Sequence, residues 1–436
     1  MSTTTTELMP VPAEPKGRLD LLKGKSSLTR TLLMAAALFS MLSLTRVITG
    51  GDDLTSSQTA GITLLVTMPI LLAGMAGLWA ERVGIVNIGI EGMMIFGTWF
   101  GGWGAWKFGP WVGLLLAIVA GALGGLLHAF AVVKFNVNHV ISGVAINLLA
   151  FGSMRYLSEL VYTADIQGAG ISQSPPQQAP IPRLNIPFLA GGEIFGWKSP
   201  DILGWFEEKG WFLISDVAGV LRGAFYNVSW ATIIGLALVP LSAWVLWRTR
   251  FGLRVRSSGE APAAAESLGV KVTPLRYYAM AISGAFAGFG GGFLAIVSSS
   301  YYRQGQTGSR GFIGLATTIF GNWRPFGVLF GALLFGFAEA MQLLSPDSLP
   351  KFCLFLSMVA GLMAIGSMVR RKLVPAINGI VAAALFLWVY ISVDKIPEPL
   401  TKATPYVLTL VVLAAASQRL RPPAHAGMPY RSGEDH

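Results

Sequence analysis

Long apolar runs, separated by short polar or Gly/Pro-rich segments, recur along almost the whole of this chain. A helix needs about 20 mostly apolar residues to cross the hydrocarbon core of a bilayer, and most of these runs approach that length. The pattern therefore predicts an all-α membrane protein, a polytopic helical bundle of about 10–12 transmembrane helices. The expected spans lie near Thr31, Thr59, Val86, Pro110, Val140, Trp230, Tyr277, Phe312, Phe326, Phe352, Leu373 and Tyr406.

The spacing of these runs also predicts how the chain is divided. Residues 1–28 are polar and rich in Thr and Pro, which is typical of a disordered tail. The first apolar run lies too deep in the chain for a signal peptide, so we expect a retained helix. We expect one transmembrane domain over 29–417, with an outer loop at 163–229, a cytoplasmic loop at 248–276, additional helices at 373–417 and a second tail at 418–436.

Composition supports the membrane class and excludes a string of soluble domains. Hydrophobic residues make up 53% of the 436 residues and charged residues only 12%, about half the charged fraction of a soluble domain. The net charge is +10, but the basic residues fall in short clusters between apolar runs, where they would face anionic membrane lipid. We therefore expect no nucleic-acid partner.

The distribution of Lys and Arg predicts the orientation in the membrane. With the N-terminus in the cytoplasm, about 20 of the basic residues fall inside and roughly seven in short outer segments, as the positive-inside rule requires. The inside set includes Lys134, Arg248, Arg324 and Arg371. We therefore expect a multi-pass protein of the cytoplasmic membrane with both termini in the cytoplasm.

The two long polar segments differ in what they predict. In the outer loop, the aromatic-rich pieces Ile194–Trp197 and Trp205–Phe212 could form short interfacial helices, either to dock a binding protein or to cap the bundle. In the cytoplasmic loop, Pro262 suits a helix start, Ala263 to Leu268 favours helix, and Gly269 suits its end. This short helix could be a lever between proteins or part of an ordinary basic loop.

Polar residues inside apolar runs are the candidates for a translocation pathway. Asn87 and Glu91 are four residues apart and share one helical face, and their burial is costly unless they meet water or partners. The structural alternative is that Asn87 bonds a neighbouring helix while Glu91 caps a helix broken at Gly89 or Gly92. Asn147 invites the same two interpretations, with Gly143 allowing close helix approach.

Aromatic and glycine residues add two weaker signals. Trp99, Trp103, Tyr301 and Tyr302 could stack on the planar ring of a ligand or form an interfacial belt. The segment Ile95 to Trp99 resembles Ile319 to Trp323, which would fit an inverted repeat.

Several kinds of chemistry are absent from the sequence. No G-x-x-x-x-G-K-[ST] phosphate loop occurs, so we do not expect this chain to bind ATP in the usual way. Cys353 is the only cysteine, and no histidines have metal-ligand spacing, so we expect no metal and no bound cofactor. No nucleophile, base and orienting group form a catalytic set, which argues against an enzyme.

Three segments carry a resemblance to a known family. GEAPAAAESLGV (Gly259 to Val270), ERVGIVNIGIEGMMIFG (Glu81 to Gly97) and GFIGLATTIFGNWRPFGVLFGALLFG (Gly311 to Gly336) resemble segments of ABC importer permeases of the branched-chain amino acid, ribose and nucleoside family. The similarity runs from about Thr59 to Lys372. The additional N-terminal span, the enlarged outer loop and the spans after Lys372 depart from the pattern.

The resemblance implies a function and a set of partners. It implies a permease that translocates nucleosides by ATP-driven alternating access, with two ATPase subunits that bind ATP and Mg²⁺, a second homologous or identical permease and an external solute-binding protein. Simple sugars such as ribose, or branched-chain amino acids, are the alternative substrates. An ion-coupled secondary transporter and a membrane scaffold remain as alternatives of another class.

The resemblance also assigns candidate residues. The ATPase-coupling residues would be Gly259, Glu260, Pro262, Ala263, Ala264, Ala265, Leu268 and Gly269. The candidates for the translocation pathway are Asn87, Glu91, Asn147, Trp99 and Tyr301.

Overall fold

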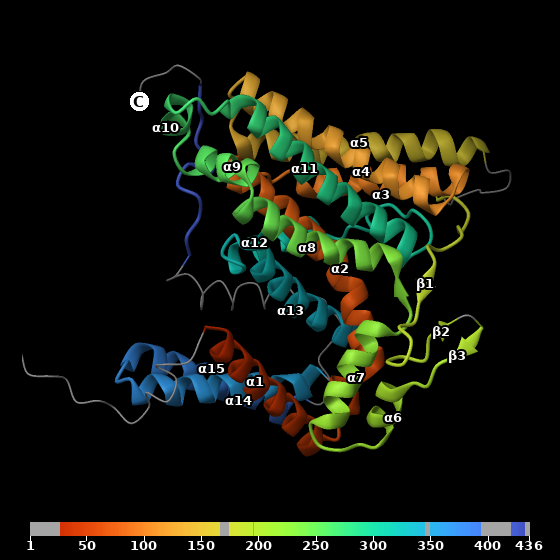
Figure 1. Cartoon of the computed structure of the whole chain (residues 1–436), viewed down its shortest axis with the longest axis vertical. Helices are drawn as coiled ribbons and strands as arrows, with labels where there is room; N and C mark the ends of the chain where they lie inside the picture. Colours follow the sequence, from red (N-terminus) through yellow and green to blue (C-terminus); the bar gives the residue numbers. More distant parts are fainter. Residues whose placement is uncertain (1–26, 166–173, 195, 345–348, 394–419, 432–436) are drawn as a thin grey trace, which may run out of the picture.

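The computed structural model describes residues 27–165, 174–194, 196–344, 349–393 and 420–431, and within them the chain is mostly helical (Figure 1). Eight of the helices are long and apolar enough to cross a membrane by length and composition. This confirms the predicted fold class, a polytopic all-α membrane protein.

Helices lie at or close to the predicted span positions that the structure describes, and the run Tyr406 to Ala416 lies outside the described residues. They are α1 (Ser27–Thr49), α2 (Ser57–Arg82), α3 (Ile90–Phe108), α4 (Pro110–Ala129), α5 (His139–Asp165), α8 (Trp230–Arg248), α11 (Val272–Phe293), α12 (Arg310–Phe320), α13 (Pro325–Leu344), α14 (Leu349–Val369) and α15 (Leu373–Ser392). The span expected near Val86 begins as a helix only at Ile90, so Asn87 lies in the break before α3, and the expectation that Asn87 and Glu91 share one helical face is wrong. A 3-10 turn, η2 (Asp52–Leu54), precedes α2, and π-helical turns η3 (Phe130–Lys134) and η4 (Leu294–Ser298) extend α4 and α11. With 11 residues, α12 is about 16 Å long, only half the thickness of the hydrocarbon core.

Helices α2 and α11 form the buried centre of the bundle and run antiparallel. Pro69 lies beside Gly290, and the Ser283 hydroxyl donates to the Ala76 carbonyl oxygen at 2.7 Å. Glycine permits this packing on both sides of α11. A side chain at Gly291 would collide with the Met94 carbonyl oxygen of α3. The core is therefore dense with backbone-to-backbone contact.

The helices around this centre are arranged as two inverted halves. Helix α2 packs against α12 and α13, while α11 packs against α3 and α4. Helix α12 runs parallel to α2, because Ala73 neighbours Gly314 and Arg82 bonds Trp323. Helix α3 runs parallel to α11 in the same way. The segments α2–α4 and α11–α13 thus have the arrangement of an inverted repeat.

The sequence echo expected to mark this repeat does not fall at equivalent positions. Ile95 to Trp99 lies inside α3, whereas Ile319 to Trp323 covers the end of α12 and the turn that follows. The packing of the helices shows the inverted repeat, and the similarity between these two five-residue segments does not mark it.

The described part of the loop over 163–229 forms short helices and strands that cap one end of the bundle, here called the α7 end. Its elements are β1 (Arg183–Leu184) paired with β4 (Val228–Ser229), β2 (Glu193–Ile194) paired with β3 (Trp197–Lys198), α6 (Ile202–Glu208) and α7 (Ile214–Phe225). The helix expected at Ile194–Trp197 is wrong, because Gly196, with φ of 83°, turns the chain into a hairpin. The helix expected over Trp205–Phe212 is present as α6, but it ends before Gly210.

Helix α7 is anchored to the helices beneath it by buried charges. The fully buried Asp216 carboxylate accepts hydrogen bonds from Ser43 and Thr55 and pairs with Arg46 at 2.8 Å, which ties α1 to the loop. Arg222 pairs with Asp201 at 2.7 Å and with Glu207 at 3.2 Å. Burial opposes the charge of Arg222, but its hydrogen bonds and proximity to these two carboxylates hold its pKa above the ordinary value.

Helices α1, α14 and α15 form a separate layer beside the bundle (Figure 1). Both α1 and α15 pack against α14, and most side chains of α15 stay exposed. The layer therefore holds the predicted N-terminal addition and the one C-terminal addition within the described residues.

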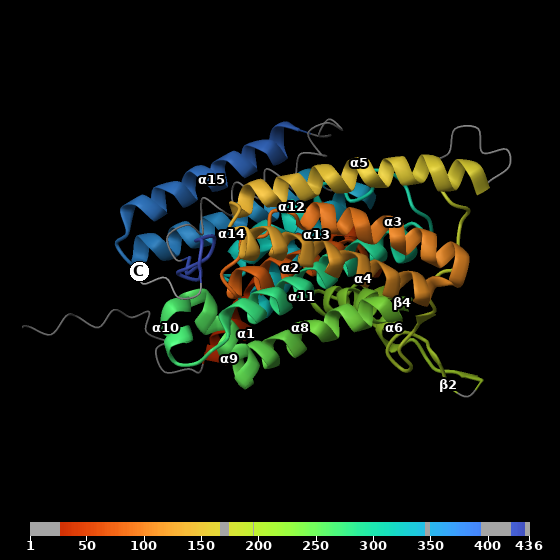
Figure 2. The same cartoon turned by 90° about the horizontal axis from the view of Figure 1, so that it is seen from above.

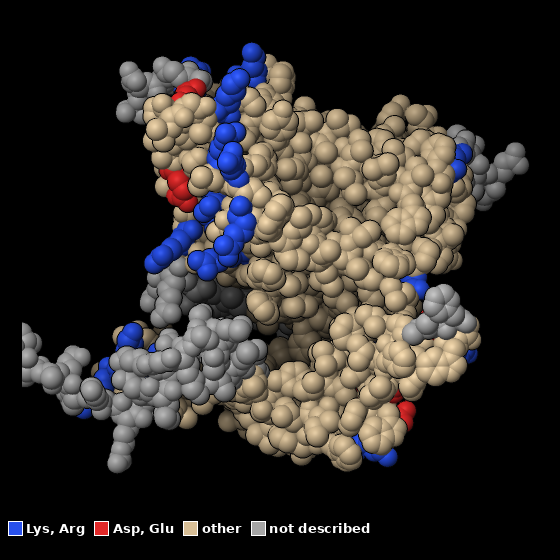
Figure 3. Space-filling model, viewed as in Figure 1, with Lys and Arg blue, Asp and Glu red and all other residues tan. Residues whose placement is uncertain are grey.

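The opposite end of the bundle, here called the α10 end, carries two short helices, α9 (Arg250–Glu260) and α10 (Pro262–Ser267). The predicted short helix is confirmed as α10, with Pro262 in its first turn and Gly269, at φ of 81°, just after it. Helix α9 was not predicted. Seen from above, α9 and α10 lie at one end of the long helices and the β2 hairpin at the other (Figure 2). Lys and Arg gather over the α9 side of this end (Figure 3).

Candidate translocation and coupling sites

The break between α2 and α3 is held by buried side chains from three other helices. The Asn87 amide donates to the Ser283 hydroxyl of α11 at 3.0 Å, and Asn87 is completely buried. His128 of α4 and His139 of α5 both bond the backbone of Val86, at 3.3 and 3.2 Å. These contacts hold the residues before α3 in a non-helical path across the bundle.

Asn147 of α5 holds the first turn of α3. Its amide oxygen accepts from the Gly92 backbone N–H at 2.7 Å, and its amide nitrogen donates to the Ile88 carbonyl oxygen at 3.0 Å. Gly143 makes this approach possible, since a side chain there would lie 2.8 Å from the Gly89 nitrogen. The contact satisfies backbone groups that a helix start leaves open.

Glu91 holds the start of a different helix from the one it belongs to. Its carboxylate accepts from the backbone N–H of Ser309 at 3.0 Å and from that of Gly311 at 2.7 Å. These N–H groups open α12, where the helix dipole favours a negative charge. From the sequence, one alternative was that Glu91 caps a helix broken at Gly89 or Gly92. In the structure its carboxylate instead caps α12, which lies far away in the sequence.

A cavity of about 310 Å³ lies where these polar groups meet. Glu91 and Asn147 line it, together with the loop 302–309 that precedes α12. The Gln306 side chain is 8% exposed, and its amide nitrogen has no hydrogen-bond partner. Leu148 and Phe151 stand at the rim on the exposed side of α5. The cavity therefore combines a carboxylate, amides and hydroxyls with an opening on the surface of the bundle.

The aromatic candidates are divided between this cavity and the packing beside it. Trp99 is buried, donates to the Ser158 hydroxyl at 3.0 Å and lies with its ring centroid 5.7 Å from that of Tyr162. Tyr302 lines the cavity, while Tyr301 is half-buried and does not. Of the five pathway candidates, Glu91 and Asn147 meet in the cavity, and Asn87, Trp99 and Tyr301 do not line it.

Sequence reasoning missed an ion pair close to the cavity. Arg310, the first residue of α12, bonds the Glu339 carboxylate of α13, and both side chains are largely buried. Charged residues within or beside apolar runs are a recognised signal of function in membrane proteins. That signal was present at Arg310 and Glu339.

The coupling candidates lie together at one corner of the α10 end, some buried and some exposed. Pro262 and Ala265 lie on the buried face of α10. Ala263, Ala264 and Leu268 are exposed, and Leu268 is 85% exposed. Gly259 lies so close to Arg82 that a side chain there would collide with the Arg82 carbonyl oxygen. The Glu260 carboxylate is 3.9 Å from the Arg82 guanidinium. The exposed face of α10 is small. The preceding helix, α9, packs against the end of α2 and so positions α10 there.

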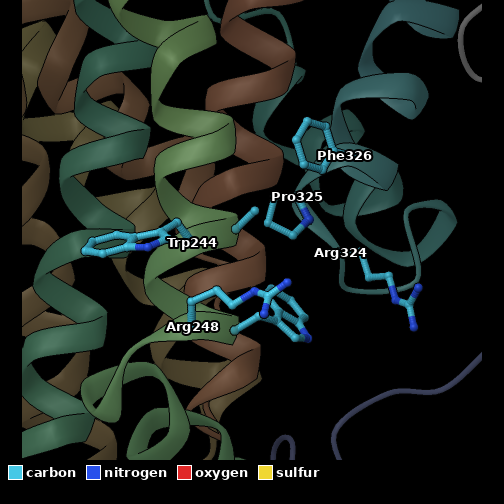
Figure 4. A pocket seen from close by; sticks show the side chains of 7 residues that line it. Trp244, Arg248, Arg324, Pro325 and Phe326 are labelled. Carbon is cyan, nitrogen blue, oxygen red and sulfur yellow. The ribbon is translucent and has the colours of Figure 1, made fainter.

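A second cavity, of about 500 Å³, lies at the same end between α8 and the start of α13 (Figure 4). Trp244 and Arg248 line one side, and Arg324 and Phe326 line the other. None of the predicted site residues lies in it. Arginine and tryptophan at the end of apolar helices form a surface suited to anionic lipid headgroups.

Comparisons with known proteins match most of the chain. The family described as "Branched-chain amino acid transport system / permease component" matches residues 59–389. The guanosine ABC transporter permease protein NupQ of Bacillus subtilis is 33% identical, over 73% of this chain and 94% of its own length. The nucleoside ABC transporter permease protein NupC of Lactococcus lactis is 32% identical, over 63% of this chain and 78% of its own.

A third relative is named for a different substrate. The putative glucose ABC transporter permease protein TsgC13 of Haloferax volcanii is 31% identical, over 63% of this chain and 74% of its own length. No solved structure matches the chain significantly.

Proposed function

Because this chain belongs to the permease family of the branched-chain amino acid transport system, we propose that it translocates nucleosides inward as the permease subunit of an ATP-driven importer. Membership makes it a multi-pass transport subunit and not an enzyme, working with a separate ATPase chain and a solute-binding protein. We propose in addition the identity of the substrate, the orientation of the chain in the membrane and the number of subunits in the complex.

The cavity between α3, α5 and α12 is the observation that supports the pathway. It lies where two interrupted segments meet, as substrate sites of inverted-repeat transporters do. Its carboxylate, amides and hydroxyls suit the many hydrogen-bonding groups of a nucleoside, and Tyr302 offers an aromatic face for the base. The names of NupQ and NupC, which specify guanosine and nucleosides, support the same substrate class. Simple sugars, which TsgC13 suggests, and branched-chain amino acids are the competing substrates.

Charge at the α10 end supports the orientation. Arg248, Arg250, Arg254 and Arg324 lie there, and the positive-inside rule places such an end in the cytoplasm. Residues 420–431 lie at the same end, which supports a cytoplasmic C-terminus. The arginine- and tryptophan-lined cavity there would contact anionic lipid of the cytoplasmic membrane.

The exposed side of the pathway cavity supports a second permease. Glu91 and Asn147 line a cavity whose rim residue Leu148 is 69% exposed, and polar groups facing lipid are costly. A second permease, identical or homologous, would cover the opening and complete the pathway between the two subunits.

ATP would drive the cycle through the exposed corner at α10. Two ATPase subunits would bind ATP and Mg²⁺, and this chain would bind neither. Closure of the ATPases would displace Gly259 to Gly269, and the helices behind them would alternate between outward and inward openings.

The test is reconstitution into liposomes with candidate ATPases and the binding protein. We expect ATP-dependent uptake of radiolabelled guanosine that survives collapse of the ion gradients. Uptake that persists without ATP and disappears with an ion gradient would establish a secondary transporter instead. If ribose or leucine were taken up in an ATP-dependent manner and guanosine were not, the assignment of nucleosides as the substrate would be wrong.

A further inference from the structure

The segment 420–431, expected to be a simple tail, lies across the α10 end and bonds three separate connections of the bundle. The Arg421 backbone N–H donates to the Asn322 amide oxygen at 2.8 Å, in the turn between α12 and α13. The His425 N–H donates to the Gly259 carbonyl oxygen at 2.9 Å, at the junction of α9 and α10. The Gly427 N–H donates to the Gly84 carbonyl oxygen at 3.1 Å, in the break between α2 and α3.

Further contacts join this segment directly to the proposed coupling residues. The Ala424 N–H donates to the Glu260 carboxylate at 3.2 Å. The Tyr430 hydroxyl donates to the Glu266 carboxylate of α10. Burial and the bond to Glu266 raise the pKa of the Tyr430 hydroxyl to about 12, so it remains a donor at physiological pH.

The Tyr430 ring adds an apolar and a cationic contact. It packs with Ala265 of α10 and Val272 of α11 in one buried cluster. The guanidinium of the buried Arg276 lies 5.0 Å from the ring centroid, within the range of a cation–π interaction. One side chain thus joins α10 to the first turns of α11.

Helix α10 needs such support to transmit a displacement. It has only six residues, and a helix this short is not stable through its own hydrogen bonds. Within α10, only Pro262 and Ala265 are buried. Pro422, Pro423 and Pro429 restrict the backbone of the crossing segment, so it resists bending more than a glycine-rich chain would.

We propose that residues 420–431 act as a brace that fixes α10 to the α2–α3 break and to α11, so that a displacement of α10 reaches the pathway. The brace rests on the proposed function, since it requires an ATPase that moves α10. It would carry the displacement from Glu260 and Glu266 to Gly84, three residues before Asn87.

The experiment compares Tyr430→Ala with Met428→Ala in the reconstituted complex. Met428 lies in the same segment with a 50% exposed side chain, which makes it a matched control. The measurement is guanosine taken up per ATP hydrolysed, together with the affinity of the permease for its ATPase. We expect Tyr430→Ala to lower the uptake ratio by roughly tenfold, because a hydrogen bond to a charged partner is lost. Met428→Ala should leave it unchanged.

A second variant removes the whole segment by ending the chain after residue 419. We expect ATP hydrolysis without matching uptake, or weakened ATPase binding if α10 loses its position. A wild-type ratio and wild-type ATPase affinity in both Tyr430→Ala and the truncated chain would overturn the brace. Failure of the proposed function looks different, because the wild-type complex would then show no ATP-dependent guanosine uptake at all.

Discussion

Glu91, in the first turn of α3, accepts a hydrogen bond from the backbone N–H of Gly311, 220 residues later in the chain, at 2.7 Å. Gly311 has no side chain, and a Cβ there would lie 2.6 Å from the same carboxylate. One carboxylate therefore joins the start of α3 in one inverted half to the start of α12 in the other. Movement between the halves must act on this contact.

The contact predicts the effect of Glu91→Gln. Glutamine keeps the size but offers one acceptor where the carboxylate offers two, and it lacks the charge that the α12 dipole favours. We expect guanosine uptake to fall roughly tenfold, in line with the loss of one charge-assisted hydrogen bond. Glu193→Gln, at an exposed hairpin position, is the control and should transport normally. Normal uptake by Glu91→Gln would remove Glu91 from the pathway.

Asn147→Leu should destabilise the bundle more than it alters binding. The substitution leaves the Gly92 N–H and the Ile88 carbonyl oxygen without their partner. Buried polar groups left unpaired cost about 1–3 kcal/mol each. We expect a lower melting temperature of the purified protein in detergent. A melting temperature equal to that of the wild type would show that water replaces the amide.

Gly291→Ala tests the close packing of α11 on α3. The added methyl group would collide with the Met94 carbonyl oxygen, and overpacking of this kind costs about 1–3 kcal/mol. Gly361→Ala in α14 is the matched control, because no atom lies within 4 Å of the added carbon. Thermal unfolding should separate the two variants. Equal melting temperatures would mean that α3 and α11 can move apart without cost.

Two substitutions at the α10 end test the coupling residues. Glu260→Lys places a second cation beside Arg82, now 3.9 Å from the carboxylate, and Ala264→Trp enlarges an exposed position on α10. Both should allow ATP hydrolysis while guanosine uptake falls, with membrane insertion intact. Ala264→Ser keeps the side chain small and is the control. Transport at the wild-type rate in both variants would remove the coupling assignment.

The sequence by itself determined the features that depend on neighbouring residues. Apolar runs of bilayer length placed the spans, because the hydrophobic effect acts on each run whatever surrounds it. Pro262 and Gly269 marked the limits of α10, since both act through local backbone geometry. The segment Gly259 to Val270 indicated the family because its residues form a short continuous motif, which can be recognised without the tertiary structure.

Only the tertiary structure decided which distant groups meet. A polar residue in an apolar run must find a partner, but the pattern does not say where. Thus one of the two open interpretations had Asn87 bond a neighbouring helix, but its partner Ser283, and the capping of α12 by Glu91, required the packed bundle. The brace at residues 420–431 was missed because most of its bonds come from backbone N–H groups, which every sequence offers equally.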